Sequence, residues 1–268
     1  MTLKKVLPRV TVLSIFAALF CVPSYAAEDE KFDIVGLKLG MTDAQVKKAL
    51  VDYGIPASDI KETRQFYGYS DGIKSDYRTQ EFLSGIGASK SLQADHNESF
   101  RILFSPPPEG GRVVAIARNI KNQTNPPTIE QYGKDLQEKY GPTISHRLTN
   151  INQWMFGQGS MNCLDSSQSG EFGLPLNTGG ILEKVFHAEG SRILTDRFRN
   201  GRVKDLNECA NMLQYELPRY VSLATSVTAT MIDVQSWVKA QLAANAMVES
   251  LRQEAIKKRE GRGTKPVL

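Results

Sequence analysis

Two segments of the chain share one arrangement of polar and apolar positions. In each, a threonine is followed three residues later by a glutamine, and an apolar stripe at helical spacing runs through the residues after the threonine; the stripes are Val46, Ala49, Leu50 and Tyr53, and Ile129, Tyr132, Leu136 and Tyr140. The threonine hydroxyl can accept a backbone amide of the first turn, and the glutamine can reach back to the threonine amide. Gly54 and Gly141 follow the stripes, as glycine commonly follows a helix. The pattern predicts helices over residues 42–53 and 128–140.

Each predicted helix is followed by a short aromatic segment with strand character, residues 65–67 after the first and residues 153–155 after the second. The two threonines lie 86 positions apart, and the two aromatic segments begin 88 positions apart. This nearly constant offset is consistent with two tandem copies of one α-then-β unit, a first unit over residues 27–125 and a second over residues 126–260. Coincidence is the alternative, because capping boxes and helix-ending glycines are common.

Four further segments predict strands joined in hairpins. Residues 100–104 and 112–118 flank a connection rich in proline and glycine, and residues 212–217 and 224–232 flank a turn that contains Pro218. In the last of these segments apolar residues alternate with serine and threonine, which is typical of a strand with one buried face.

Asp233 can cap a long last helix that runs to Arg259, with apolar positions at helical spacing. We interpret this stripe as a face that packs on the sheet; a partner-binding groove and a membrane surface are the alternatives. The elements together predict an α+β fold with an antiparallel sheet, packed helices, a long C-terminal helix and a mobile tail over residues 261–268. Residues 70–97 and 157–180 read as long polar loops, where we expect a binding surface.

The first 26 residues have the composition of a cleavable secretory signal. Three basic residues precede an apolar stretch over residues 10–22, Pro23 interrupts it, and Ser24 and Ala26 stand at the two positions that a signal peptidase reads. The stretch is shorter than the ~20 residues that span a bilayer. An uncleaved anchor and lipidation at Cys21 are the alternatives. We therefore predict an exported protein of the periplasm or the cell exterior.

The net charge of the chain adds little to this prediction. The net charge is +4, and removing the three basic residues of the signal leaves +1, since the signal holds no acidic residue. Much of the remaining positive charge lies near the C-terminus, at Lys257, Lys258, Arg259, Arg262 and Lys265. Nucleic-acid binding needs a larger clustered positive surface, so we predict none. A weak membrane-surface contact through the basic C-terminal tail is an alternative role.

The start of the first helix reads Gly40-Met41-Thr42, followed by Gln45 and Val46. It resembles the G-M-T-x-x-Q-V helix start of two kinds of small exported domain. One is the SmpA/OmlA-like domain of outer-membrane assembly lipoproteins, and the other is the β-lactamase-inhibitor-protein-like fold, which has two tandem α-then-β copies. The second unit departs from the motif, since residues 126–127 are two prolines. The resemblance implies a non-catalytic, protein-binding α+β module and assigns no functional residues.

Two cysteines, Cys163 and Cys209, remain after the signal. An even number in an oxidising compartment favours a disulfide between them, which could add roughly 4 kcal/mol on the chain-entropy model. Two buried thiols or a reactive thiol are the alternatives. In the last case Cys163, with His187 as its base, would make the protein a cysteine hydrolase.

Other patterns for catalysis or cofactors are missing from the sequence. His96, His146 and His187 stand at no zinc-ligand spacing, and there is no C-x-x-C. Ser160 falls one place late for a G-x-S-x-G nucleophile turn, and no glycine-rich loop leads into the lysine and helix of a P-loop. We therefore predict a protein that is not an enzyme, needs no cofactor and binds another exported or envelope protein.

Overall fold

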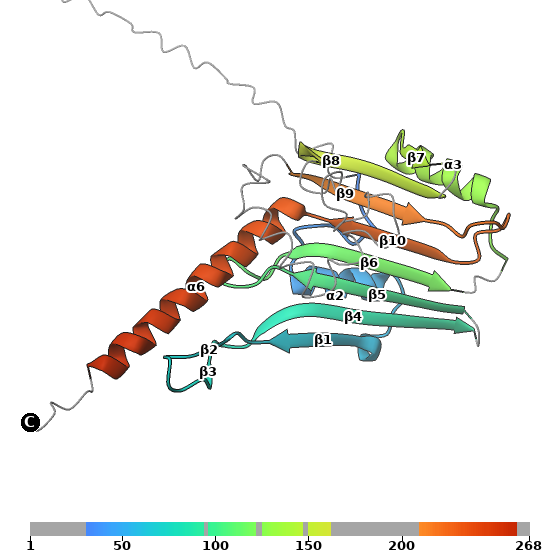
Figure 1. Ribbon diagram of the computed structural model, residues 1–268. Coiled ribbons are helices and arrows are strands. Elements are labelled where there is room, and N and C mark those ends of the chain that lie inside the picture. Colours follow the sequence, from blue (N-terminus) through green and yellow to red (C-terminus); the bar gives the residue numbers. More distant parts are fainter. Residues whose placement is uncertain (1–30, 94–95, 122–124, 147–149, 162–208, 262–268) are drawn as a thin grey trace, which may run out of the picture.

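One antiparallel sheet organises the protein. The computed structural model describes residues 31–93, 96–121, 125–146, 150–161 and 209–261. Eight strands form the sheet in the order β1-β4-β5-β6-β10-β9-β8-β7 (Figure 1). Each pair of neighbours runs antiparallel.

The elements fall into two similar runs. The first run contains α2 (Asp43–Asp52), the single 3-10 turn η1 (Ala57–Asp59), β1 (Ile60–Gln65), β4 (Phe82–Gln93), β5 (His96–Phe104) and β6 (Val113–Lys121). The second run contains α3 (Ile129–Tyr140), β7 (Ile144–His146), β8 (Ile151–Met161), β9 (Cys209–Glu216) and β10 (Val227–Ile232). A hairpin of β2 (Gly68–Tyr69) and β3 (Tyr77–Arg78) lies between β1 and β4 in the chain, and α6 (Val234–Glu260) follows β10.

Each run is therefore one helix followed by four sheet strands, and the last strands of the two runs, β6 and β10, pair in the middle of the sheet. The predicted α+β fold with an antiparallel sheet and a long C-terminal helix is confirmed. The two predicted hairpins are also confirmed, as β5–β6 and β9–β10.

The helices begin where the sequence predicts. Thr42 accepts from the amide of Gln45 at 3.3 Å, and the Gln45 side chain accepts from the amide of Thr42 at 2.9 Å, which completes a capping box. In α3, Thr128 accepts from the amide of Gln131 at 3.1 Å, but the Gln131 side chain donates to Asp135. The second cap is therefore half of the expected box.

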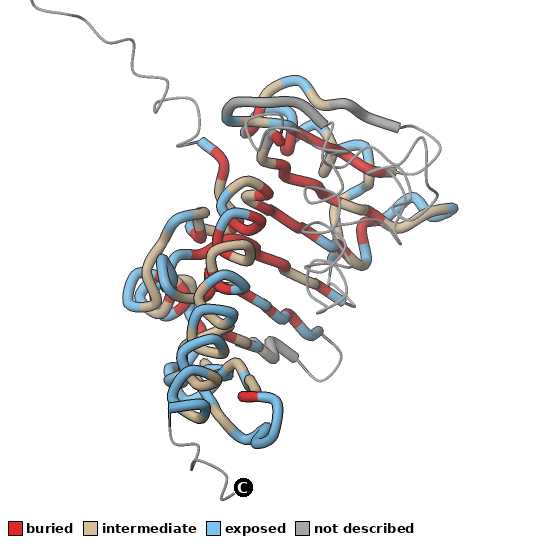
Figure 2. The backbone as a smooth tube through the Cα atoms, turned by 60° about the vertical axis from the view of Figure 1, so that its left-hand side comes forward, coloured by how far each residue is buried: buried red, intermediate tan, exposed pale blue. Residues whose placement is uncertain are grey.

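The long helix α6 packs on the sheet only through its first half. Its buried residues end at Ala244, and Figure 2 shows the far end in the colours of exposed and intermediate residues. The β2–β3 hairpin lies beside this far part, because Arg259 donates to the Asp71 carbonyl. In the first half of α6, Gln241 donates at 3.2 Å to the hydroxyl of Tyr67, the residue before β2. The predicted packing of the apolar stripe on the sheet thus holds for half of the helix.

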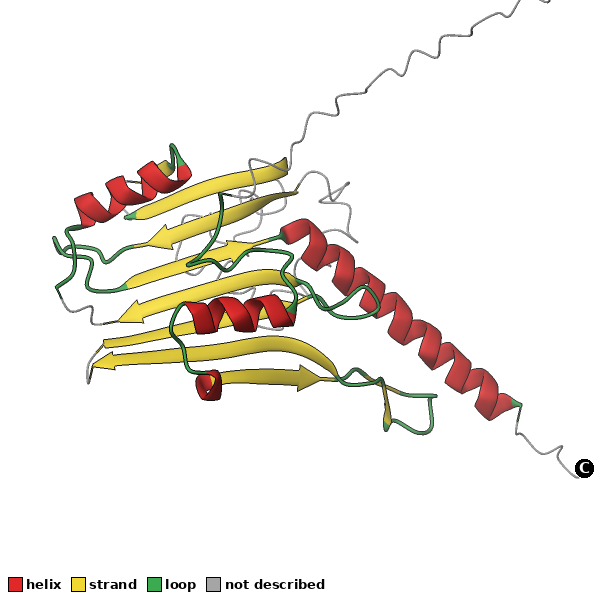
Figure 3. Ribbon diagram, turned by 180° about the vertical axis from the view of Figure 1, so that it is seen from behind, coloured by secondary structure: helices red, strands yellow, loops and turns green. Residues whose placement is uncertain are grey.

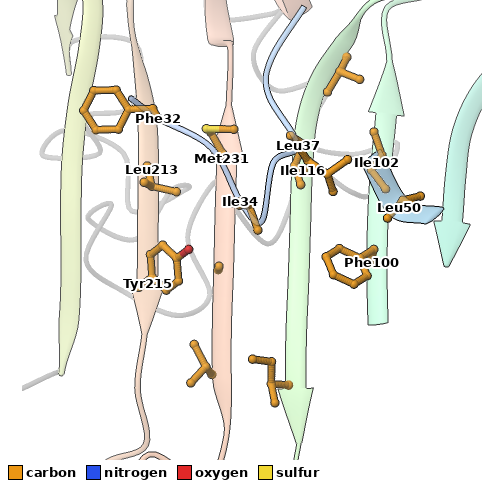
Figure 4. Close-up of a cluster of buried hydrophobic side chains, with 14 of the residues drawn as sticks. Phe32, Ile34, Leu37, Leu50, Phe100, Ile102, Ile116, Leu213, Tyr215 and Met231 are labelled. Atoms are coloured by element: carbon orange, nitrogen blue, oxygen red, sulfur yellow. The ribbon is translucent and has the colours of Figure 1, made fainter. Parts of the chain in front are cut away.

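The core lies between one face of the sheet and a layer made by α2, α3 and the segment before α2 (Figure 3). In that segment Ile34 and Leu37 are fully buried, and Figure 4 shows them among side chains of the central strands, including Met231 and Ile116. Burying an isoleucine or leucine completely contributes about 1.5–3 kcal/mol. The segment before the helix is therefore part of the core.

The prediction of a polar loop over residues 70–97 is wrong. Most of its second half is β4, a twelve-residue strand paired on both sides. Two glycines of this strand, Gly85 and Gly87, resemble a break in the sequence, but they alternate with buried Ile86 and Ala88. A Cβ at Gly85 would lie 3.0 Å from the carbonyl oxygen of Ile102. The close approach of β5 favours glycine at that position.

Four other predictions differ from the structure or fall wholly or largely outside the described residues. The aromatic segment at residues 65–67 largely follows β1, which ends at Gln65. Residues 157–161 belong to β8, and residues 162–180 lie outside the described residues. The predicted signal and nearly all of the predicted tail also lie outside them.

Candidate functional site

The structure describes one of the two cysteines of the predicted pair, Cys209. Cys209, the first residue of β9, is buried and disulfide-bonded, and its carbonyl accepts from the Gln235 side chain at 2.7 Å. Cys163 and His187 lie outside the described residues. The Cys163–Cys209 pairing and the alternative Cys163–His187 catalytic pair both remain predictions.

The histidines are placed far apart in the chain topology. His96 begins β5 and His146 ends β7, and four strands lie between β5 and β7 in the sheet order. In the ranges that the structure describes, no group of three or more histidine, cysteine, aspartate or glutamate side chains could hold a metal ion. Within the same ranges no helix is long and apolar enough to cross a membrane.

A buried polar cluster joins the end of α2 to the sheet. Glu98 on β5 is only 2 % exposed, and its carboxylate pairs with Arg118 on β6. The hydroxyl of Tyr53, the C-cap residue of α2, donates to Glu98 at 3.0 Å and accepts from Arg118 at 2.8 Å. The register of the two strands brings Glu98 and Arg118 together, since Arg118 stands opposite Phe100, two residues after Glu98.

The electrostatics of this cluster indicate a structural role. Burial disfavours the charged form of Arg118, but Glu98 and the neighbouring tyrosines together outweigh it and raise the pKa of the guanidinium above its usual range. Burial also raises the pKa of the Tyr53 phenol, which stays protonated near neutral pH and cannot act as a base there. The groups satisfy one another and hold the helix to the sheet.

An aromatic cluster likewise holds the end of α3 to its neighbours. The Tyr140 hydroxyl donates to the Asp33 carbonyl at 2.7 Å and lies 3.2 Å from the Tyr215 hydroxyl. Trp154 donates to the carbonyl of Gly141 at 2.9 Å. Burial raises the pKa of Tyr140 to about 12, so this phenol is also neutral at physiological pH. Both buried clusters anchor helix ends, and neither offers a reactive group.

Exposed apolar side chains gather on the turn between β9 and β10, residues 217–226. Tyr220 is 98 % exposed, Val221 52 % and Leu223 42 %. Single exposed apolar residues are ordinary on protein surfaces, but neighbouring ones mark interaction sites. We call residues 217–226 the β9–β10 turn and take it as the candidate functional site.

Backbone hydrogen bonds hold the β9–β10 turn against its neighbours. Leu217 donates to the carbonyl of Asn150 at 3.0 Å, and the Asn150 side chain donates to the Pro218 carbonyl at 2.6 Å. On the other side, the amide of Ile129 donates to Ser222 and the amide of Ala224 donates to Pro127, each at 2.9 Å. The turn is therefore fixed to the starts of β8 and α3.

The backbone of Tyr220 supports the same interpretation. Its φ is 62°, in the left-handed region that costs a non-glycine residue roughly 1–2 kcal/mol. Such strained positions cluster at functional sites. Here an exposed aromatic side chain occupies a position where glycine would fit without strain.

The sequence predicted this turn but not its role. The predicted binding surfaces were residues 70–97 and 157–180, whereas the exposed cluster lies in the turn containing Pro218. The available signal was the run Tyr220-Val221, which puts apolar side chains where turns usually carry polar ones.

Comparisons with known proteins add no further assignment. No family model, curated protein or solved structure matches this chain.

Proposed function

We propose that this chain is an exported, non-catalytic protein that binds another protein through the β9–β10 turn. The observation that carries the proposal is Tyr220, an almost completely exposed tyrosine on a turn tied to two other elements. Tyrosine is enriched among the residues that contribute most to protein–protein affinity. It presents a large rigid surface with only two side-chain torsions to immobilise.

The fixed backbone of the turn also favours binding. Ordering a mobile loop on association costs free energy, and a loop already held in place avoids that cost. Val221 and Leu223 extend the apolar surface beside the ring, and Arg219 is the one charged residue of the turn. The partner should therefore offer an apolar recess for the ring and a polar group for the phenol hydroxyl.

Features of the sequence support export and a binding role. The signal pattern of the first 26 residues directs the chain out of the cytoplasm, and the resemblance at residues 40–46 implies a protein-binding module. A disulfide between Cys163 and Cys209 belongs to the same proposal, since it suits an oxidising compartment and leaves no thiolate for catalysis.

Affinity capture tests the proposal. The chain without its predicted signal, residues 27–268, is immobilised and exposed to the cell envelope of its native organism at moderate salt. We expect one stoichiometric protein partner for the wild-type chain and an affinity lower by about 30-fold for Tyr220→Ser, the loss of a typical hot spot. Val51→Ser, which removes a 47 % exposed apolar residue on α2, is the matched control and should retain the partner.

Two results contradict the proposal. One is a partner held equally well by the Tyr220→Ser chain, which would move the interface elsewhere. The other is recovery of the wild-type chain alone, which would direct attention to thiol labelling of Cys163 in non-reduced protein and a substrate screen.

A further inference from the structure

A second exposed apolar residue lies at the far end of α6. Ile73, in the turn of the β2–β3 hairpin, is 83 % exposed. Arg259 in the last turn of α6 donates to the carbonyl of Asp71, and a Cβ on Gly72 would lie 3.1 Å from the Arg259 guanidinium. The hairpin turn and the helix end thus form one surface, which we call the distal tip; its residues are Gly72, Ile73, Lys74, Lys257, Lys258 and Arg259.

The hairpin turn is held in a fixed shape. The Asp71 carboxylate is buried and accepts from the amides of Ile73 and Lys74 at 2.9 and 2.7 Å. The Tyr77 hydroxyl donates to the same carboxylate at 3.2 Å. The backbone hydrogen bonds, that of Lys74 first, hold the pKa of this carboxyl below its usual range, so it stays ionised near neutral pH. Ile73 is therefore presented to solvent by a braced turn.

The surroundings of Ile73 are basic. Four cations belong to the distal tip, Lys74 and three in the last turn of α6, while Asp76 and Glu260 are the exposed carboxylates paired with them. With the ionised Asp71 carboxylate included, the local balance is four positive charges minus three negative, or +1. Beyond Gly261 the sequence adds Arg262 and Lys265 and no acidic side chain.

We propose that the distal tip docks on the surface of an anionic phospholipid bilayer. Ile73 enters the boundary between headgroups and acyl chains, and the lysines around it lie among the lipid phosphates. A single apolar group or a few cations alone bind membranes poorly, but the two signals together reinforce one another. The long helix meets the membrane end-on, so the β9–β10 turn at the opposite end of the molecule remains free for its partner (Figure 1).

The chemistry of the distal tip favours lipid over the other anionic partners. Nucleic acids are bound by broader positive surfaces, and single strands by exposed aromatic rings that stack on bases. The residue at the centre here is aliphatic, and the two tyrosines of the hairpin, Tyr69 and Tyr77, stack on each other with ring centroids 5.4 Å apart. An aliphatic side chain on a surface that also carries lysines and an arginine matches a bilayer, which has an apolar interior beneath an anionic surface.

Vesicle flotation with residues 27–268 tests the proposal. We expect binding to vesicles of phosphatidylcholine and phosphatidylglycerol in equal parts and little binding to phosphatidylcholine alone. Raising the salt from roughly 0.05 to 0.5 M should release the protein, because the Debye length shortens. The double variant Lys257→Gln/Lys258→Gln should bind about 25-fold more weakly, since each cation near the surface contributes about fivefold. Ile73→Ser should lose about tenfold.

Matched variants separate the distal tip from general effects. Lys48→Gln/Lys134→Gln makes the same change in net charge on α2 and α3 and should bind vesicles as wild type does. Tyr220→Ser should also bind them normally, so failure of the membrane proposal is distinguishable from failure of the protein-binding proposal. An unchanged thermal unfolding midpoint shows that each variant is folded.

Several outcomes overturn the proposal: no preference for the anionic vesicles, equal binding by the wild-type chain and the distal-tip variants, or equal loss in the Lys48→Gln/Lys134→Gln control. Binding to a duplex oligonucleotide in the same salt range, with none to anionic vesicles, would assign the distal tip to a different class of partner.

Discussion

The β9–β10 turn and the distal tip expose apolar side chains to nearly the same extent but in different settings. Tyr220 is 98 % exposed and has one charged neighbour in its turn. Ile73 is 83 % exposed, precedes Lys74 and lies in a turn that contacts the basic last turn of α6. An exposed fraction by itself therefore says little about the partner. The type of side chain and the charge around it indicate a protein recess for the first surface and an anionic bilayer for the second.

The two surfaces also differ in what supports them. The β9–β10 turn is fixed to α3 and β8 at the edge of the main core. The distal tip depends on the hydrogen bond between the hairpin turn and Arg259, which lies in the part of α6 that has left the sheet. Changes in the sheet should therefore affect the first surface through global stability, and changes in α6 should affect the second surface locally.

The largest expected effect comes from replacing Glu98. This residue stands opposite Ile120 on β6, and Ile120 in turn stands opposite Val227, the first residue after the β9–β10 turn, so the buried pair lies in the same row of the sheet as the start of β10. Glu98→Ala leaves Arg118 without its buried counter-charge, which typically lowers the free energy of unfolding by about 3–5 kcal/mol. Urea denaturation measures this loss of unfolding free energy. Glu62→Ala removes the carboxylate of the ion pair with Lys47 nearer the surface and should leave the unfolding free energy nearly unchanged. Equal losses in the two variants would contradict the structural role of the cluster.

The next effect is a loss of stability at alkaline pH. Burial raises the pKa of Tyr140 to about 12, so the folded state retains a proton that the unfolded state loses near pH 10. Stability is therefore constant below about pH 9 and falls between pH 10 and 12, by roughly 2 kcal/mol for this group. Denaturation at a series of pH values measures the slope, and Tyr140→Phe should reduce it. A stability that rises over this range would contradict the burial of the phenol.

A smaller change should separate binding from folding at the β9–β10 turn. Tyr220→Gly relieves the positive φ but adds freedom to the unfolded chain, so the unfolding free energy should rise by about 1 kcal/mol or stay the same. Capture of the protein partner should be lost. Calorimetry and affinity capture on one preparation test both statements. A clear destabilisation would show that Tyr220 packs on the fold rather than serving a partner.

The smallest effect on global stability is expected at the distal tip. Arg259→Ala frees the hairpin turn from α6 but leaves the sheet intact, so the unfolding free energy should hardly change. Amide hydrogen exchange at residues 71–74 should become faster, and binding to anionic vesicles should weaken. Arg252→Ala, which removes an exposed ion pair with Glu249 on the same helix, is the control and should leave this exchange unchanged.

The helices were predictable because their signals are local. The threonine caps and the glycines at residues 54 and 141 lie within one turn of the helix ends, and the apolar stripes run along the helices themselves. The β5–β6 and β9–β10 hairpins were predictable for the same reason, since each joins adjacent segments through a turn with recognisable residues. β4 was missed because its glycines resemble a break until the close approach of β5 is known.

The candidate site likewise combines features set by local sequence with features set by contacts between distant parts of the chain. The sequence by itself determined the start of each long helix, the α+β class and the residues of the Pro218 turn, because these depend on neighbours within a few positions. Tertiary structure decided that Glu98 and Arg118 are paired in the interior and that Tyr220 is left in solvent. It also decided that the Asp71 carbonyl meets the end of α6, 188 positions later at Arg259. Such contacts join strands and helices far apart in the chain, and burial depends on the whole packed arrangement.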